Sequence, residues 1–335
     1  MDISFPKMCD EAMFRLRMLL RKRNVNKLIF LMYHSVIRTP LQVYSCFVEE
    51  SSFRNQMIYL KRHFEVISLS EAVKRLESGK IHQPAAVITL DDGLQNNYDF
   101  AFPTLREAGL PATIFLTTGL VNTNDTIWYC RLNLALSETS RTSIVWDGSS
   151  FDLSEPGCRA YAASVIGARV KEFPHRKLLT EIRKIVLDLG CDPNTGVKVS
   201  SPFRMLSHKA IAEMTDSGLI EFGAHTHSHA ILSLLSPEER YDEITRSVAA
   251  VHDLTGRPCE FFAYPNGRAQ DYNTEVIKIL EACGVRASLT AIEGYNDETT
   301  PVMELRRIGI GANMSMNKFK RKVHGFSWRR GLWHR

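Results

Sequence analysis

The sequence has no long uninterrupted hydrophobic run and no large excess of either charge. None of its apolar stretches approaches the roughly 18 residues of a membrane-spanning helix. Lysine and arginine (42 residues) exceed aspartate and glutamate (37 residues) by only five, which is too few to predict a nucleic-acid-binding protein without a concentrated basic patch. Glycine (19) and proline (13) are not abundant among the 335 residues, of which 44% are hydrophobic. Collagen-like and intrinsically disordered chains are therefore excluded.

Cysteine is also uncommon, and no two cysteines form a close pair such as Cys-x-x-Cys. The seven cysteines are Cys9, Cys46, Cys130, Cys158, Cys191, Cys259 and Cys283. Their odd number and wide spacing predict free thiols in a reducing compartment, and they exclude a metal site built on sulfur ligands. The first apolar stretch, Leu28–Met32, continues into Tyr33 and His34 without a small-residue cleavage site, so it predicts a strand rather than a signal peptide. A cytoplasmic protein is expected.

Compact apolar runs alternate with helical patterns along most of the chain, which is typical of a βα repeat and a parallel sheet. The expected strands cover residues 28–32, 66–67, 86–90, 112–116, 220–222, 260–263, 285–289 and 305–310. Helices are expected between them. The best marked helix begins at Ser236 and Pro237, carries a capping box through Glu239 and ends at Gly256. The alternation predicts an α/β fold.

The repeat is interrupted by an insertion at about residues 121–202. This insertion contains a predicted hairpin on the turn Asp147-Gly148, followed by helical patterns at 159–173 and 177–189. The main domain is therefore expected to span residues 28–311, with the insertion within it.

Two basic segments flank this domain. Residues 1–27 are expected to form a basic helical segment, and residues 312–335 a basic, aromatic tail without a periodic pattern. The tail is either solvated or a site of peripheral membrane contact, and nucleic acid is the less expected partner. The oligomeric state is left open.

Two groups of polar residues directly follow predicted strands. Asp91 and Asp92, with Gly93, end the strand at 86–90; a simple turn is the alternative reading of these three residues. Three histidines between 225 and 229 follow the strand at 220–222. Two imidazoles four residues apart and one carboxylate could supply three metal ligands and leave a position open for water. A structural histidine cluster is the alternative there.

Together these residues resemble the polysaccharide deacetylase family, which has the NodB homology domain and is similar to carbohydrate esterase family 4. Its motif Thr-Phe-Asp-Asp-Gly corresponds to Thr-Leu-Asp-Asp-Gly at 89–93, and its motif His-Ser/Thr-x-x-His corresponds to His-Thr-His-Ser-His at 225–229. The resemblance implies a distorted (β/α)7 barrel. It also implies a divalent metal, with Zn²⁺ the expected ion, held by Asp92, His225 and His229. Asp91 would then be the catalytic base, and His227 a spacer.

The third family motif, Arg-x-Pro-Tyr, is matched only in part by Phe-Phe-Ala-Tyr-Pro-Asn-Gly at 261–267. Ala263 stands where the family has an arginine that orients the base. Either another cation takes that role here, with Arg306 and Arg307 the candidates, or Asp91 is less constrained than in the family. The Phe-Ala-Tyr-Pro form resembles the circularly permuted subgroup that acts on poly-N-acetylglucosamine.

In that subgroup the Leu-x-His motif has moved to the N-terminus as a strand that ends in Tyr-His, and Leu-Met-Tyr-His at 31–34 is similar to such a strand end. We expect His34 to be the general acid, because the amine released in amide hydrolysis must be protonated as it leaves; a buried structural histidine is the alternative. The oxyanion is expected to lie at the turn Tyr264, Pro265, Asn266 and Gly267. Proline has no N–H, so the backbone N–H of Asn266 is the preferred donor, with its side chain a bystander.

The expected activity is metal-dependent removal of N-acetyl groups from an N-acetylated aminosugar, oligosaccharide or polysaccharide. Hydrolysis of a non-carbohydrate C–N amide and a degenerate sugar-binding module are the alternatives. The complete Asp-Asp and His-x3-His set favours an enzyme, because sugar binding alone requires neither a metal nor a free carboxylate. The insertion is expected to lie over the carboxyl ends of the strands, where Trp128 and Tyr129 could stack on a sugar ring.

Overall fold

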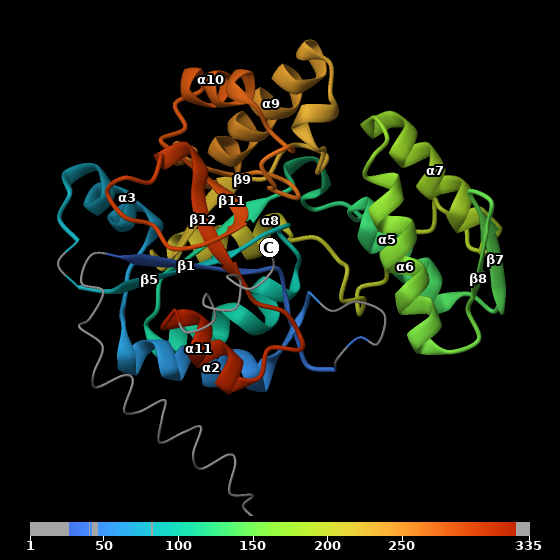
Figure 1. Cartoon of the computed structure of the whole chain (residues 1–335), viewed down its shortest axis with the longest axis horizontal. Coiled ribbons are helices and arrows are strands. Elements are labelled where there is room, and N and C mark those ends of the chain that lie inside the picture. Colours follow the sequence, from blue (N-terminus) through green and yellow to red (C-terminus); the bar gives the residue numbers. More distant parts are fainter. Residues whose placement is uncertain (1–26, 40, 42–45, 82, 326–335) are drawn as a thin grey trace, which may run out of the picture.

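A closed barrel of parallel strands forms the centre of the computed structural model, which describes residues 27–39, 41, 46–81 and 83–325 (Figure 1). Around the barrel the order is β1 (Leu28–Tyr33), β12 (Leu305–Gly309), β11 (Ala287–Glu293), β10 (Phe261–Ala263), β9 (Ile220–Ala224), β6 (Ala112–Leu116) and β5 (Ala85–Leu90). β1 closes the ring by pairing along its whole length with β5. The predicted (β/α)7 barrel is confirmed.

The barrel strands are almost wholly buried; no residue of β5 or β6 is exposed. Alternate residues of a strand point to opposite faces, and the strands accordingly contribute to two hydrophobic clusters. Phe30 and Val87 belong to the cluster inside the barrel, whereas Ile29 and Ile88 belong to the cluster beneath the surrounding helices. Continuous apolar runs such as that of β5 are typical of strands covered on both faces.

Helices cover the outside and the amino-terminal end of the barrel. The outer cluster includes residues of α2 (Glu50–His63), α4 (Phe102–Ala108), α8 (His208–Asp216), α9 (Pro237–Thr255), α10 (Thr274–Ala282) and α11 (Met316–Val323). α3 (Leu69–Ser78) packs with the inner cluster, and its first backbone N–H groups donate to Glu221 near the start of β9. The predicted capping box of α9 and its end at Gly256 are confirmed.

Three short strands and a distorted helix complete the barrel domain. β4 (Glu65–Val66) pairs with the first half of β5, and β2 (Val36–Ile37) pairs with β3 (Val48–Glu49). A π-helical turn at Asn97–Ala101 leads into α4. These elements lie outside the closed ring of strands.

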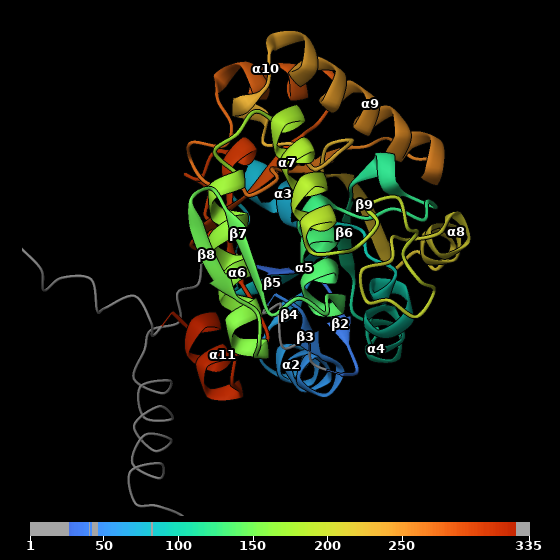
Figure 2. The same cartoon turned by 90° about the vertical axis from the view of Figure 1, so that its right-hand side faces the viewer.

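The insertion forms a separate layer beside the barrel, with a hydrophobic cluster of its own (Figures 1 and 2). Its predicted hairpin is confirmed as β7 (Ser143–Trp146) and β8 (Ser149–Asp152), joined by Asp147 and Gly148, both with positive φ. α6 (Pro156–Val170) and α7 (His175–Asp188) correspond to the predicted helices. α5 (Trp128–Glu138) was not predicted; it has no side-chain cap to mark its start.

The tail expected at 312–335 is partly helical, which corrects the prediction of an unpatterned segment. α11 begins after the N-cap Ser315 and buries Phe319 and Val323, and it packs against α2. Its apolar residues Met316, Phe319 and Val323 are three and four positions apart, a helical spacing that the prediction missed. The predicted segment 1–27 lies almost wholly outside the described residues, as does the chain after 325. Among the helices described, none is long and apolar enough to span a bilayer.

Candidate active site

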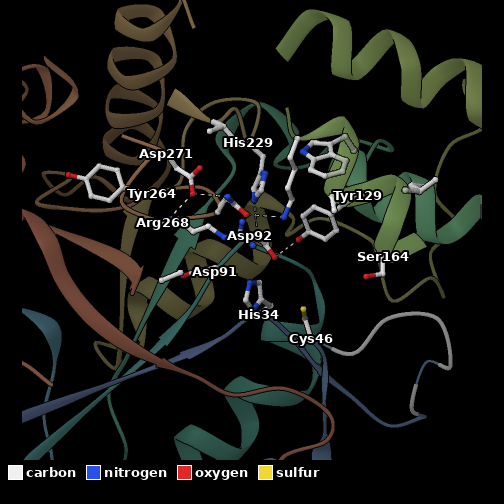
Figure 3. Close-up of a pocket in the computed structure, with 18 of the residues that line it drawn as sticks. His34, Cys46, Asp91, Asp92, Tyr129, Ser164, His229, Tyr264, Arg268 and Asp271 are labelled. Atoms are coloured by element: carbon white, nitrogen blue, oxygen red, sulfur yellow. Dashed lines mark hydrogen bonds and ion pairs between the residues drawn. The ribbon is translucent and has the colours of Figure 1, made fainter. Parts of the chain in front are cut away.

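The carboxyl ends of the barrel strands open into a cavity of about 1060 Å³ (Figure 3). Most of the predicted site residues line this cavity: His34, Asp91, Asp92, His225, His229, Tyr264, Asn266 and Arg307. They come from β1, β5, β9, β10 and β12 or from the loops that follow these strands. The insertion supplies the opposite wall, so its predicted position over the strand ends is confirmed by the lining residues of α5 and α6.

Asp92, His225 and His229 converge on one point in this cavity. Their side chains are 1%, 3% and 9% exposed, and Asp92 Oδ1 lies 3.6 Å from His225 Nε2 and 3.4 Å from His229 Nε2. Asp92 Oδ1 is buried without a hydrogen-bond partner among the residues described. A buried carboxylate oxygen without a partner is costly unless a cation compensates it. One carboxylate and two imidazoles are a donor set that fits a divalent metal such as zinc.

The histidine ligand candidates are held in different ways. His225 Nδ1 donates to the carbonyl of Ala263 at 2.6 Å, which leaves Nε2 as the acceptor directed at Asp92. Burial lowers the pKa of His225 to about 4, so this imidazole is neutral at neutral pH, as a metal ligand must be. His229 Nδ1, by contrast, is buried and has no hydrogen-bond partner in the described part of the chain.

The loops that carry these residues adopt left-handed backbone conformations. Asp92 has φ of 77°, and Thr226, His229 and Asn266 each have φ of 61°. Non-glycine residues in this region cost of the order of 1 kcal/mol or more, and they concentrate at functional sites. The surrounding contacts must therefore hold these loops in place.

Glu243 of α9 holds the loop after β9. Its carboxylate accepts the backbone N–H groups of His227 and Ser228 at 2.8 and 2.9 Å, and also the hydroxyl of Ser228. The ring of His227 bonds to Arg246 and Thr118 and is not one of the three residues that converge at Asp92. This placement agrees with its expected role as a spacer.

Asp91 is paired with Arg307, one of the two arginines that the sequence suggested. The guanidinium of Arg307 donates to both oxygens of Asp91, at 2.7 and 2.8 Å, and both side chains are buried. Burial alone would raise the pKa of Asp91, but the charge and the hydrogen bonds of Arg307 oppose it, and the pKa lies below its usual value. Arg306 is exposed and points to the opposite face of β12, so the structure does not bring it to the site.

His34 lies beside Asp91 at the mouth of the barrel. The residues before them, Tyr33 and Leu90, are paired across β1 and β5, and the backbone N–H of Asp91 donates to the carbonyl of Tyr33 at 2.9 Å. His34 is half-buried, and its Nδ1 is buried without a hydrogen-bond partner in the described chain. Among the described residues this ring nitrogen is therefore not committed to a structural hydrogen bond.

The turn after β10 offers one free backbone donor. The N–H of Tyr264 donates to Leu289, that of Gly267 donates to Pro265, and Pro265 itself has none. No bond involves the backbone N–H of Asn266 within the described chain. The Asn266 N–H is therefore available to a ligand, and its role at the oxyanion stays a prediction.

The side chains of this turn differ from the expectation. The hydroxyl of Tyr264 donates to the carbonyl of Met303 at 2.9 Å, and its ring stacks on Tyr272 at 4.2 Å, so the phenol is held in the core rather than offered to a ligand. The Asn266 side chain, expected to be a bystander, accepts from Lys171 of the insertion and donates to Asp271. The bond from Lys171 thus connects the insertion to the turn after β10.

Tyr129 of α5 was considered for sugar stacking, but the structure places its hydroxyl on Asp92, to which it donates at Oδ2 (Figure 3). Its ring packs edge-on against His229, with 5.4 Å between the ring centroids. Trp128 belongs to the hydrophobic cluster of the insertion and also lines the cavity, so its stacking on a sugar ring stays a prediction. Neither the role of Tyr129 nor that of Lys171 had a signal in the sequence, because both depend on how the insertion docks.

Comparisons with known proteins agree with this site. Residues 78–288 match the family model of polysaccharide deacetylases. YxkH of Bacillus subtilis, which carries the name of a polysaccharide deacetylase, is 23% identical over 295 residues, or 88% of this chain and 75% of that protein. A poly-β-1,6-N-acetyl-D-glucosamine N-deacetylase of Staphylococcus epidermidis is 34% identical over 108 residues, which are 31% of this chain and only 36% of that relative.

Solved structures share the fold. The deacetylase PplD of Streptococcus pyogenes, solved in complex with acetate, superposes with a TM-score of 0.59 at 20% identity, covering 89% of this chain and 98% of that one. IcaB of Ammonifex degensii has a TM-score of 0.56 at 19% identity, covering 90% and 97%. At such identities these likenesses establish the fold alone.

Proposed function

The chain belongs to the polysaccharide deacetylase family, and on that premise we propose that it is a metal-dependent hydrolase that removes N-acetyl groups from an aminosugar in an oligosaccharide or polysaccharide. One observation carries the proposal: the Asp92, His225 and His229 donors meet beside the Asp91–Arg307 pair in one cavity. The cavity, at about 1060 Å³, is as large as the largest usual small-molecule pockets, which favours an oligomeric substrate.

Asp92 Oδ1 and the Nε2 atoms of His225 and His229 would hold the divalent ion, with zinc the expected one. When bound, such an ion polarises a carbonyl oxygen and lowers the pKa of water. The carboxylate of Asp91 would accept the proton of the attacking water. Arg307 keeps that carboxylate ionised and fixed, and it uses only two of the roughly four acceptor positions of a carboxylate.

His34 would donate the proton that the leaving amine requires. It and Asp91 follow paired residues of neighbouring strands, so acid and base would stand side by side at the mouth of the barrel. The backbone N–H of Asn266 would stabilise the oxyanion of the tetrahedral intermediate. The assignment is supported by the absence of any other free N–H in that turn among the described residues.

The experiment is acetate release from N-acetylglucosamine oligomers by the purified chain, measured before metal removal, after chelation, and after zinc is restored. We expect activity to disappear on chelation and to return with zinc. Activity that survives complete metal removal would contradict the metal dependence. A zinc-loaded protein that binds the oligomers without releasing acetate would instead be a sugar-binding module, and one that hydrolyses only other amides would contradict the substrate class.

A further inference from the structure

The two carboxylate oxygens of Asp92 have different surroundings. Oδ1 faces His225 and His229 and has no partner among the residues described, whereas Oδ2 accepts the hydroxyl of Tyr129. Tyr129 does not belong to the barrel strands or their immediate loops. It lies in α5, at the start of the inserted segment.

We propose that Tyr129 is a positioning residue of the metal site, through which the inserted segment sets the affinity for the metal. The inference rests on the proposed metal site. A carboxylate can bind a metal through one oxygen or two. The hydroxyl of Tyr129 occupies one lone pair of Oδ2 and fixes the orientation of the carboxylate, which favours binding of the metal through Oδ1, the oxygen that faces His225 and His229. Binding through a single oxygen of Asp92 keeps the remaining positions open for water and substrate.

The ring of Tyr129 contacts another candidate ligand, His229. Metal-binding histidines usually donate their other ring nitrogen to a fixed acceptor, as His225 does to the carbonyl of Ala263. His229 has no such bond within the described chain. The His229 imidazole is instead packed between rings, with 5.4 Å to the centroid of Tyr129 and 5.0 Å to that of His225, so the Tyr129 ring is one of the contacts that orient it.

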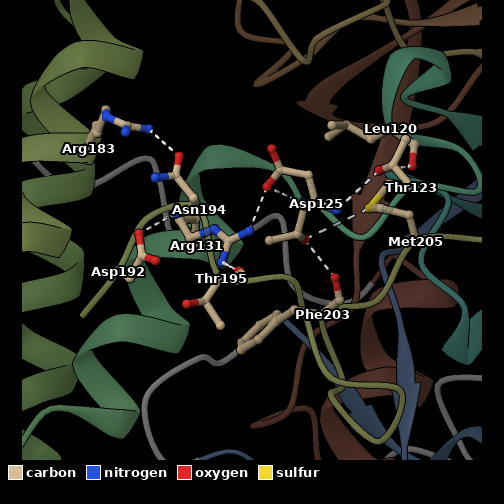
Figure 4. Close-up of polar contacts among 11 residues, drawn as sticks. Leu120, Thr123, Asp125, Arg131, Arg183, Asp192, Asn194, Thr195, Phe203 and Met205 are labelled. Atoms are coloured by element: carbon tan, nitrogen blue, oxygen red, sulfur yellow. Dashed lines mark hydrogen bonds and ion pairs between the residues drawn. The ribbon is translucent and has the colours of Figure 1, made fainter.

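The inserted segment is anchored well enough to hold Tyr129 in place. Near the start of α5, Arg131 forms an ion pair with Asp125 at 2.6 Å and donates to the carbonyl of Thr195 at 2.8 Å (Figure 4). Across the cavity, Lys171 and His175 bond to the loops after β10 and β9, each at 2.9 Å. The segment thus contacts each of the loops that carry the proposed ligands and the oxyanion donor.

Tyr129→Phe tests the hydroxyl alone, because the variant keeps the ring and its packing. The dissociation constant for Zn²⁺ is measured by competition with a chelating dye, and we expect it to rise by about 10- to 100-fold. The thermal unfolding midpoint of the metal-free protein should stay near that of the wild type. Tyr161→Phe is the matched control, because Tyr161 lies in α6 of the same segment and is 67% exposed.

A second measurement reads the coordination directly. In the Co²⁺-loaded protein the visible absorption should change in Tyr129→Phe and not in Tyr161→Phe, because Asp92 is free to bind through both oxygens only in the first. An unchanged zinc affinity together with an unchanged Co²⁺ spectrum in Tyr129→Phe would overturn the inference while leaving the proposed deacetylation intact. A wild-type protein that binds no zinc would overturn both.

Discussion

Replacing Arg307 should show how strongly the barrel depends on one buried ion pair. The Arg307 side chain is 1% exposed and forms two charge-assisted hydrogen bonds with Asp91. Each such bond contributes about 1.5–3 kcal/mol, and removing one partner of a buried pair typically costs about 3–5 kcal/mol. The whole stability of a protein is usually about 5–15 kcal/mol. Arg307→Met should therefore be near the limit of folding.

Arg307→Lys is the gentler test, because it keeps the charge and removes the fork of donors. A lysine can replace one of the two bonds to Asp91, but not the added bonds to Thr290 at 2.8 Å and Thr89 at 3.2 Å. We expect a loss of at least about 2 kcal/mol in the free energy of unfolding, because the variant gives up one charge-assisted bond to Asp91 and both bonds to the threonines. Turnover should fall by about 100-fold, as for a catalytic group displaced by about 1 Å.

The assays are urea unfolding and acetate release, with Arg306→Lys as the matched control. Arg306 is the exposed neighbour on the same strand, and its replacement should change neither quantity. In the double variant Asp91→Asn/Arg307→Met no charge is left unpaired, so its destabilisation should be smaller than the sum of the two single effects. Equal stability and turnover in Arg307→Lys and Arg306→Lys would refute this reasoning.

Three further substitutions test the site and the barrel. Asp91→Asn should keep its zinc and lose about 10²–10⁴-fold in turnover per folded molecule; full activity would remove Asp91 from the mechanism. His34→Ala should keep fold and metal and lose about 10²-fold or more in turnover, whereas a structural histidine would lower stability and spare the turnover of the folded fraction. Gly223→Ala should cost about 1–3 kcal/mol in urea unfolding, because its Cβ would lie 2.6 Å from the Phe115 ring and the Phe261 carbonyl. Gly157→Ala, with open space around it, is the control, and matching unfolding midpoints would contradict the packing argument.

The barrel was predictable because its strands are local, compact apolar runs. β6 begins and ends at the predicted residues, and the capped helix α9 does so as well. β11 was placed at 285–289 but runs from Ala287 to Glu293, since its second half is more polar and owes its conformation to pairing with β12. α5 was not predicted because its apolar residues lie on most sides of the helix and give no clear amphipathic period, and because no capping residue marks its start.

The site was predictable where its residues stand together in the sequence. Asp91 with Asp92, and His225 with His229, are short motifs at strand ends, so their spacing alone brings each pair to the mouth of the barrel. Tyr129 depends on the docking of a whole inserted layer, and no local pattern encodes that. The sequence alone could have distinguished Arg307 from Arg306, because residues two apart on a strand share a face and Arg307 is two residues after the apolar Leu305.

The position of Arg307 follows from the geometry of a closed barrel. Leu305 lies in the inner cluster. Arg307, two residues later, continues the same face and reaches across β1 to Asp91 at the end of β5. Ala263 belongs to the same inner cluster on β10, where the family resemblance expects the guanidinium. Because inward-facing residues at the carboxyl ends of all the strands converge on one small volume, a cation from either strand can pair with the same carboxylate. The small side chain of Ala263 then leaves that volume to Arg307, while its carbonyl orients His225.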